Sequence, residues 1–377
     1  MSKRDSKPVE GRYEFHDEGI KFHETRKIKG RGTAYNPPNR FEEISIEPDP
    51  DFDPVHDSRP KTRFLKDTSH TAIAYNSSPD VPFDASINPY RGCEHGCVYC
   101  YARPTHEYLG FSAGLDFETK IVVKEDAPEL LSAELSSTKW KPQVLALSGV
   151  TDPYQPIEKK LGLTRRCLEV LAMFRNPVMV VTKNHLVTRD IDLLQELADA
   201  NAAAVYISIT TLDVELCNVM EPRTSRPERR LRAVDALSKA GIKTGVLVAP
   251  IIPGLTDSEI PSIIEKSAMA GAQFAGYVTL RLPLGVKHLF ERWLEAHFPN
   301  KKGKVLNRVR ELRGGRLNDP RFGSRMKGEG VFAEQIQSLF ELSCRKAGIA
   351  RVLPSLSTDS FTMPDRSDDK SQLSLFD

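Results

Sequence analysis

The sequence predicts an α/β fold in which six strand–helix units form a partial (β/α)6 barrel of the TIM type. From about residue 84 to about residue 283, short apolar runs alternate with longer amphipathic stretches, in repeats of about thirty residues. Runs such as residues 178–181 are apolar throughout, which suits strands buried on both faces of a parallel sheet. Because six units are too few for a closed eight-stranded barrel, we expect the barrel to be open.

The expected strands are short, apolar and rich in β-branched residues, and they comprise residues 85–88, 143–147, 178–182, 204–210, 243–249 and 276–282. Ser225 with Glu228, and Thr256 with Glu259, have the spacing of a capping box, in which a hydroxyl and a carboxylate bind the first free backbone N–H groups of a helix. These two pairs predict where two of the intervening helices begin.

Composition divides the chain into four segments. Residues 1–70 are polar and rich in Gly, Pro and Asn, which predicts an extended arm on the main domain. Residues 71–285 form the barrel. Residues 286–353 form a helical extension, with helices expected at 286–297, 304–312 and 331–347. Residues 354–377 are rich in Ser, Asp and Pro, which predicts a disordered tail.

The composition of the 377 residues is that of an ordinary globular protein, with 40% hydrophobic residues and a net charge of +2. No apolar run approaches the roughly 20 residues that a membrane helix needs, and the charged N-terminus resembles no secretory signal. We therefore expect a cytoplasmic protein without a membrane partner. In that compartment thiols are kept reduced, so the six cysteines do not predict a disulfide framework.

Three of the cysteines lie within eight residues, and Cys93, Cys97 and Cys100 have the spacing C-x3-C-x2-C. Thiolates are good ligands for iron–sulfur clusters, and three of them leave a fourth iron open to a substrate or cofactor. Gly92 and Gly96 relieve steric crowding, so that the loop can wrap a cuboidal cluster. The spacing therefore predicts an iron–sulfur site on this loop.

A zinc site completed by His95 or His106 is the alternative. Structural zinc sites usually combine two C-x2-C pairs, and the sequence has no second pair. The spacing thus favours the cluster over zinc without excluding zinc.

With Tyr99 before the last cysteine, the motif resembles the signature of the radical S-adenosylmethionine (SAM) superfamily. The stretches INPYRG (87–92), CYAR (100–103) and TDPYQP (151–156) resemble the spore-photoproduct-lyase-like, or DNA repair photolyase, branch, and the resemblance covers residues 84–285. It implies a [4Fe–4S] cluster on the three cysteines, with SAM bound to the open iron. It also implies a 5′-deoxyadenosyl radical that abstracts hydrogen from the substrate.

The expected strand ends carry the residues assigned to cofactor binding, together with Tyr99: Gly149, Thr151, Asp152, Lys183, Ser208 and Thr210. By the resemblance, Lys183 contacts the carboxylate of SAM, as a charge-assisted bond would allow. Ser208 and Thr210 are expected to meet ribose or carboxylate oxygens, and Gly149 lets the backbone approach the methionine moiety.

The sequence departs from the lyase in one respect. Spore photoproduct lyase has a cysteine hydrogen donor where Gly149 stands here, so spore photoproduct itself is not assigned as the substrate. Tyr154 and Cys217 are the candidates for a replacement donor. The predicted function is a lyase-like enzyme that acts on a damaged or modified DNA base. The alternatives are a radical SAM enzyme that modifies RNA, protein or a small molecule, and a non-catalytic iron–sulfur adaptor.

Residues 301–330 contain ten Lys and Arg against three acidic residues, which predicts phosphate contacts by Arg313, Arg316 and Arg321. Residues 223–232 add five arginines against one acid, Glu228. Solvated helix faces are the alternative for both segments. The expected partners are DNA and an electron donor such as flavodoxin or ferredoxin.

The C-terminal peptide QLSLF (372–376) resembles the peptide by which bacterial repair factors dock on the sliding clamp. Leu373, Leu375 and Phe376 would be the apolar anchors and Gln372 the polar contact, on a flexible tether. The alternatives are that these residues fold back onto the core, or that the match is accidental.

Overall fold

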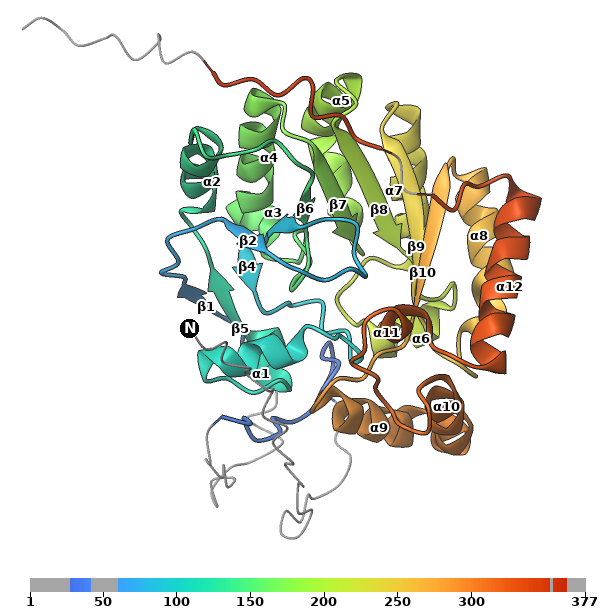
Figure 1. Cartoon of the computed structure of the whole chain (residues 1–377). Helices are drawn as coiled ribbons and strands as arrows, with labels where there is room; N and C mark the ends of the chain where they lie inside the picture. Colours follow the sequence, from blue (N-terminus) through green and yellow to red (C-terminus); the bar gives the residue numbers. More distant parts are fainter. Residues whose placement is uncertain (1–27, 42–59, 353–354, 365–377) are drawn as a thin grey trace, which may run out of the picture.

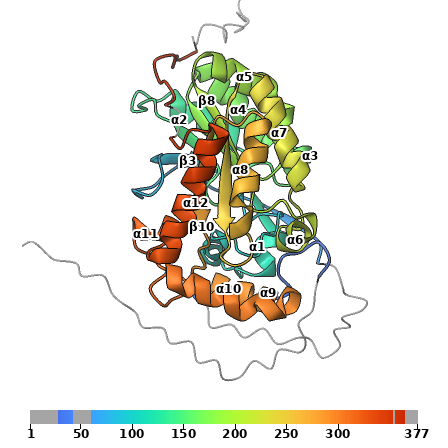
Figure 2. The same ribbon diagram turned by 90° about the vertical axis from the view of Figure 1, so that its right-hand side faces the viewer.

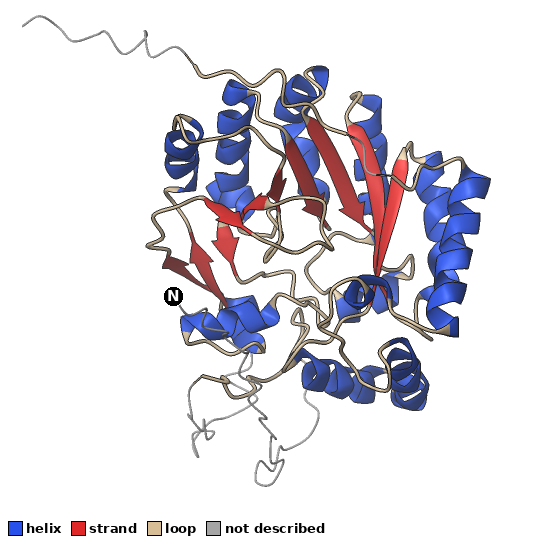
Figure 3. Cartoon of the chain, in the orientation of Figure 1, coloured by secondary structure: helices blue, strands red, loops and turns tan. Residues whose placement is uncertain are grey.

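The computed structural model describes residues 28–41, 60–352 and 355–364. Its main sheet has the strand order β10-β9-β8-β7-β6-β3-β2 among these residues (Figures 1 and 3). The parallel strands are β3 (Ala85–Ile87), β6 (Leu145–Leu147), β7 (Val178–Thr182), β8 (Ala203–Ser208), β9 (Lys243–Ile251) and β10 (Phe274–Thr279). Strand β2 (Ile73–Tyr75) pairs antiparallel with β3. The expected six parallel strands in an open sheet are confirmed.

Alternating side chains explain why these strands are apolar on both faces. Val178 and Val180 belong to the main core beneath the outer helices, whereas Met179 packs inside the barrel with Tyr206 and Phe274. The outer layer consists of α2 (Ala127–Leu135), α4 (Leu163–Phe174), α5 (Ile191–Asp199), α7 (Pro227–Lys239), α8 (Ile260–Met269) and α12 (Val331–Ala347) (Figure 2).

A small second sheet lies beside the barrel, with the order β1 (Arg63–Lys66), β5 (Lys120–Val123) and β4 (Tyr90–Arg91). Sequence analysis missed it because strands of two to four residues are too short to show a hydrophobic period. The segments η1 (Arg103–Leu109) and α1 (Leu115–Thr119) lie between β4 and β5 along the chain.

Residues 28–41 of the expected arm pack against the cysteine loop. The buried carboxylate of Glu118 accepts hydrogen bonds from the backbone N–H groups of Gly32 and Thr33, both at 3.0 Å, and from Arg103 at 2.6 Å. The approach requires glycine, because a Cβ added to Gly32 would lie 1.7 Å from the carbonyl oxygen of Gly96. The arm therefore packs against the loop that carries Cys97 and supports it.

The first three helices after β10 gather at the carboxyl ends of the strands (Figure 1). They are α9 (Val286–His297), α10 (Pro299–Leu312) and α11 (Ser324–Lys327). Phe290 and Trp293 of α9 share one apolar cluster with Val98 of the cysteine loop. The remaining short elements are α3 (Glu158–Leu161), η2 (His185–Asp190), α6 (Val214–Met220) and η3 (Asp257–Glu259). No helix in the described part of the chain is long and apolar enough to cross a membrane.

The prediction of a disordered tail from residue 354 is wrong for residues 355–364. The amide of Ser357 donates to the carbonyl of Asn201 at 2.9 Å, and the ring of Phe361 stacks on Phe174 with centroids 6.1 Å apart. This segment runs along the end of the barrel opposite α9 and α10 (Figure 1). The clamp-like residues 372–376 lie outside the described residues.

Candidate active site at the cysteine loop

The cysteine loop follows the short strand β4 at the carboxyl end of β3. Cys93 and Cys97 are buried, Cys100 is partly exposed, and all three thiols are free. Gly92 and Gly96 have φ angles of +79° and +68°, which side-chain-bearing residues rarely adopt. A Cβ added to Gly96 would also lie 2.7 Å from a carboxylate oxygen of Glu118. The loop conformation thus depends on these glycines.

The segment after β6 holds the first half of this loop. The hydroxyl of Thr151 donates to the carbonyl of Gly92 at 2.7 Å, and the amide side chain of Gln155 donates to the same carbonyl at 3.2 Å. Gln155 also accepts from the backbone N–H of Glu94 at 2.9 Å, and the Glu94 carboxylate accepts from the N–H of Ile157 at 2.8 Å. Thr151, expected to bind cofactor, therefore positions the loop.

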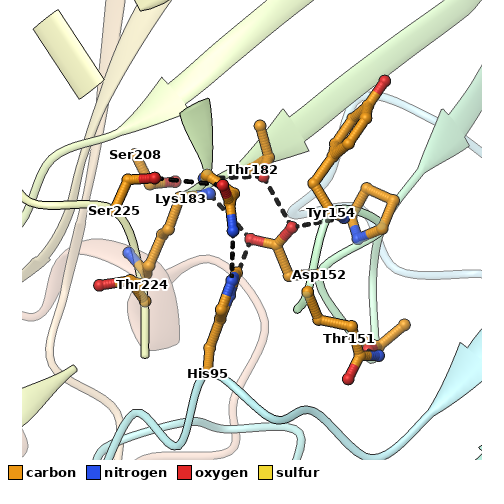
Figure 4. Close-up of polar contacts among 12 residues, drawn as sticks. His95, Thr151, Asp152, Tyr154, Thr182, Lys183, Ser208, Thr224 and Ser225 are labelled. Atoms are coloured by element: carbon orange, nitrogen blue, oxygen red, sulfur yellow. Dashed lines mark hydrogen bonds and ion pairs between the residues drawn. The ribbon is translucent and has the colours of Figure 1, made fainter. Parts of the chain in front are cut away.

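Asp152 joins the cysteine loop to the end of β7 (Figure 4). Its carboxylate accepts from the hydroxyl of Thr182 at 2.7 Å and from the N–H of Lys183 at 2.8 Å, and it lies 3.3 Å from Nδ1 of His95. Burial lowers the pKa of His95, but the Asp152 carboxylate and then the Cys93 thiol outweigh burial and raise that pKa to about 10. Both Asp152 oxygens are engaged, so this residue also acts on the loop.

The two histidines of the zinc alternative have other partners. Nε2 of His95 lies 3.1 Å from the side-chain nitrogen of Asn184, and Nε2 of His106 lies 2.9 Å from the carbonyl of Lys120. In the part of the chain that the structure describes, no three His, Cys, Asp or Glu side chains form a group that could hold a single metal ion. A cluster makes a different demand, because each thiolate binds its own iron.

A buried carboxylate, Glu221, connects the cysteine loop to the ends of β7 and β8. The hydroxyls of Tyr99 and Thr210 donate to Glu221, the latter at 2.7 Å, and Nζ of Lys183 lies 3.5 Å away. The guanidinium of Arg230 donates to the second carboxylate oxygen. Burial raises the pKa of Glu221, but Arg230 and then Lys183 outweigh burial and hold that pKa far below its usual range. Glu221 is therefore a buried anion with two cationic partners.

Arg230 is itself fully buried, so it forms part of the core and not of a basic surface patch. Besides Glu221, it donates to the carbonyls of Ser225 at 2.7 Å and Ser208 at 3.0 Å. Nothing in the sequence distinguishes Glu221 from the other glutamates or Arg230 from its neighbouring arginines. Sequence analysis therefore missed both residues.

Lys183 points across the barrel. Its ammonium donates to the carbonyl of Ala249 at 2.9 Å and to the hydroxyl of Thr210 at 3.2 Å, and it lies 5.8 Å from the ring centroid of Tyr99. The structure thus brings three of the expected cofactor residues together. Ser208 lies at the carboxyl end of β8, with its carbonyl held by Arg230.

The two candidate hydrogen donors are both buried. Tyr154 is fully buried, and its hydroxyl donates to Asp190 at 3.1 Å within the main core (Figure 4 shows its ring). This placement makes the assignment of Tyr154 wrong, because the hydroxyl is committed to the core. Cys217 is closer to the site, with its sulfur 3.7 Å from Glu221 and 3.6 Å from Arg230, but it is buried beside that ion pair.

Tyr101, directly after Cys100, lies at the open side of the site. It is 51% exposed, and its hydroxyl donates to the carbonyl of Gly149 at 2.6 Å. Gly149 has a φ of +135°, which favours glycine. The guanidinium carbon of Arg281, which follows β10, lies 5.4 Å from the Tyr101 ring centroid. Both residues lie beside the cysteine loop, yet neither was among the predicted site residues.

The three arginines that were predicted to contact phosphate lie in different surroundings. Arg313 is buried and donates to the hydroxyl of Thr279 at 2.7 Å and the carbonyl of Leu280 at 2.8 Å, so its prediction is wrong. Arg321 is exposed, but it forms ion pairs with Asp319 at 2.8 Å and with Glu329 at 2.9 Å. Arg316 is exposed, and for this residue the prediction stands untested.

The donor set fits an iron–sulfur cluster. Burial and then the Glu221 carboxylate raise the pKa of Cys97, while burial and then the Cys93 thiol raise the pKa of Cys100 to about 11. The thiols of Cys97 and Cys100 therefore need a cationic centre to become thiolates, and the irons of a cluster would supply one.

Comparison with known proteins agrees with this reading. The radical SAM superfamily pattern matches residues 87–266. An uncharacterized protein of Mycobacterium bovis is 37% identical over 244 residues, which cover 63% of this chain and 71% of the relative. A radical SAM Nα-GlyT isomerase of Pseudomonas phage M6 is 24% identical over 219 residues, 58% of this chain and 44% of the relative.

Among solved structures, the fold is similar to a spore photoproduct lyase variant with bound AdoMet and dinucleoside spore photoproduct. The TM-score is 0.53 at 17% identity, over 75% of this chain and 78% of the other. The chain therefore belongs to the radical SAM superfamily, and its cofactors are a [4Fe–4S] cluster and S-adenosylmethionine.

Proposed function

We propose that the protein is an enzyme that acts on a damaged or modified base of DNA, with its cluster held by Cys93, Cys97 and Cys100. When bound, the cluster and SAM supply a 5′-deoxyadenosyl radical that abstracts hydrogen from the substrate. The protein binds and orients the reactants and excludes water. The arm behind the loop and α9 beside it serve that exclusion.

Lys183 is the residue we assign to the carboxylate of SAM. An ammonium paired with a carboxylate forms a charge-assisted hydrogen bond, and the acceptors Thr210 and Ala249 already hold this side chain across the barrel. Glu221 contacts both Lys183 and Tyr99. Arg230 donates to the same carboxylate, so this buried ion pair positions the two side chains. Ser208 and Thr210, at the carboxyl end of β8, remain the candidates for the other polar contacts of the cofactor.

The proposal of a nucleic-acid substrate is based on the exposed ring of Tyr101. Nucleobases stack on exposed aromatic rings, and this ring is anchored through its hydroxyl directly beside the third cysteine. The fold likeness to a lyase with a bound dinucleoside lesion supports the same reading.

Replacing Lys183 with methionine is expected to weaken SAM binding while the cluster is retained. Losing a hydrogen bond to a charged group costs about 1.5–3 kcal/mol, which corresponds to a roughly tenfold to hundredfold higher dissociation constant. Titration of reconstituted protein with SAM measures the affinity, and the absorption spectrum reports the cluster. Unchanged affinity would remove Lys183 from the cofactor site.

The proposed reaction is tested by anaerobic turnover with deuterium-labelled oligonucleotides that carry damaged bases. We expect deuterium to appear in 5′-deoxyadenosine only with a DNA substrate. A Tyr101→Leu variant should cleave SAM without substrate at the same rate as the native protein, but should transfer less label from DNA. Label transfer from RNA or peptide substrates alone would overturn the DNA assignment, and absence of SAM cleavage would favour the adaptor alternative.

The phage relative favours a second candidate reaction. This relative is an isomerase, so a radical rearrangement of a modified base is the alternative to bond cleavage. Mass analysis after digestion of the product to nucleosides distinguishes the two, since an isomer keeps the mass of the modified nucleoside, whereas bond cleavage gives smaller nucleosides.

The proposed partners follow from this function. A flavodoxin or ferredoxin would supply the electron in the cytoplasm. The peptide 372–376, with Gln372, Leu373, Leu375 and Phe376, would dock on the sliding clamp and bring the enzyme to replicating or repaired DNA.

A further inference from the structure

The guanidinium of Arg281 has N–H donors for which the described residues provide no oxygen acceptor. Its Nε is buried and has no hydrogen-bond partner among those residues. Its Nη1 donates only to the sulfur of Met326, at 3.4 Å, and a thioether is a weak acceptor. An unsatisfied buried donor on a charged group is costly, so its persistence needs an explanation.

The surroundings of Arg281 are positively charged. Burial and then Arg325 lower the pKa of Arg281, and burial and then Arg281 lower the pKa of Arg313 to about 10. Asp80 opposes these effects at Arg281, but its carboxylate is ion-paired with Arg325. Asp319, the acid near Arg313, is paired with Arg321. Three arginines thus gather at the end of β10, beside acids that already have partners.

The position of Arg281 indicates what kind of group this positive charge binds. Arg281 lies at the carboxyl end of a barrel strand, where functional groups collect, and its guanidinium contacts the ring of Tyr101 beside the cysteine loop. Like charges held together raise the free energy of the folded protein unless an anion joins them. The arrangement is therefore complementary to an anion that enters the open side of the site.

We propose that Arg281 binds a backbone phosphate of the substrate, adjacent to the base that stacks on Tyr101. This inference rests on the proposed function, since it names how the same site takes a nucleotide. A guanidinium suits the role because its fork of N–H donors matches a phosphate and its charge persists despite burial. Arg281 would then select a phosphodiester-linked nucleotide over a free nucleoside.

The test compares Arg281→Gln with Arg345→Gln, which removes the same charge from an exposed position on α12. Binding of a short single-stranded oligonucleotide is measured by fluorescence anisotropy at several salt concentrations. For Arg281→Gln we expect the affinity for the oligonucleotide to be lower by roughly tenfold or more. The slope of log affinity against log salt concentration should fall by about one, as expected for one lost phosphate contact. Arg345→Gln should behave as the native protein, and SAM affinity should be unchanged in both variants.

A second oligonucleotide carries a neutral methylphosphonate beside the target base. It should bind the native protein about as weakly as the natural strand binds Arg281→Gln, and the variant should not distinguish the two strands. Thermal melting distinguishes phosphate binding from a structural role, because replacing a residue that only stabilises the fold would lower the melting temperature. Removing Arg281 should leave the melting temperature unchanged or higher, because repulsion is relieved, and inorganic phosphate should stabilise the native protein more than the variant.

The failures of the two proposals are distinguishable. Equal DNA affinity and salt dependence in Arg281→Gln, with label transfer from DNA intact, would overturn the phosphate contact and spare the proposed function. A loss of SAM affinity would assign Arg281 to the cofactor and overturn the contact as well. If the native protein neither binds nor processes DNA, both proposals fail. Should Arg281→Gln not fold, Arg281→Lys, which keeps the charge but loses the fork, must bind DNA more weakly than the native protein.

Discussion

Replacing Cys97 and Cys100 together with alanine is expected to abolish the [4Fe–4S] cluster. A cluster left with one of its three thiolates loses most of its protein ligation, and both ring nitrogens of His95, the histidine between Cys93 and Cys97, have other partners. Iron and sulfide analysis after anaerobic reconstitution, together with the visible absorption spectrum, measures the loss. We expect almost no bound iron in the double variant.

The matched control replaces Cys167 and Cys344, which lie in α4 and α12 and are buried in the main core. These thiols behave as small apolar side chains, so their replacement should cost some stability but no iron. Near-full iron in the Cys97→Ala, Cys100→Ala variant would show that the motif is not the cluster site.

Replacing Arg230 with methionine is expected to lower the free energy of unfolding by about 3–5 kcal/mol, the usual cost of removing one partner of a buried ion pair. Glu221 would stay buried with its charge, supported among the described residues by Lys183, two hydroxyl donors and the weak thiol donor of Cys217. Urea unfolding of the apoprotein, followed by circular dichroism, measures the change. A loss below about 1 kcal/mol, typical of an exposed pair, would contradict the buried network.

The control is the double variant Arg230→Met, Glu221→Leu, which removes both charges of this ion pair and leaves Lys183 with its acceptors Thr210 and Ala249, and we expect it to recover much of the lost stability. The pH dependence has a definite sign. Because Arg230 and Lys183 depress the pKa of Glu221, the native protein gains stability from this carboxylate above its unfolded pKa and loses it as the pH falls. In Arg230→Met the carboxylate is protonated more easily, so the difference between the two proteins should shrink toward acidic pH.

Hydrophobic patterning predicted the barrel strands closely. Strand β7 has the predicted bounds, Val178–Thr182, and so do the helices α9 and α12. The strand β10 begins two residues before its prediction, at Phe274. These elements were accessible from sequence because each buries one or both faces, and burial leaves a local apolar pattern.

Local capping signals were less reliable. The sequence predicted Ser225 as the start of a helix, but α7 begins at Pro227 and follows Arg226. The hydroxyl of Ser225 instead donates to Asn184 at 3.1 Å and accepts from the N–H of His185 at 2.8 Å. Thr256 does precede the helical segment η3, as predicted, but its hydroxyl accepts from the N–H of Ile252 at 2.9 Å and makes no capping hydrogen bond. A short hydroxyl side chain has several backbone groups within reach, and tertiary contacts decide among them.

By itself, the sequence determined the open barrel and the cysteine loop with its glycines, because apolar periodicity and ligand spacing are local properties of the chain. Only the tertiary structure decided which charges are buried. Arg230 and Arg313 were counted with basic surface segments, yet both lie in the interior. The buried Nε of Arg281, beside the cysteine loop, has no hydrogen-bond partner among the residues that the structure describes. The reason is physical: the energy of a charge depends on its solvent exposure and on partners that fold together from distant parts of the chain.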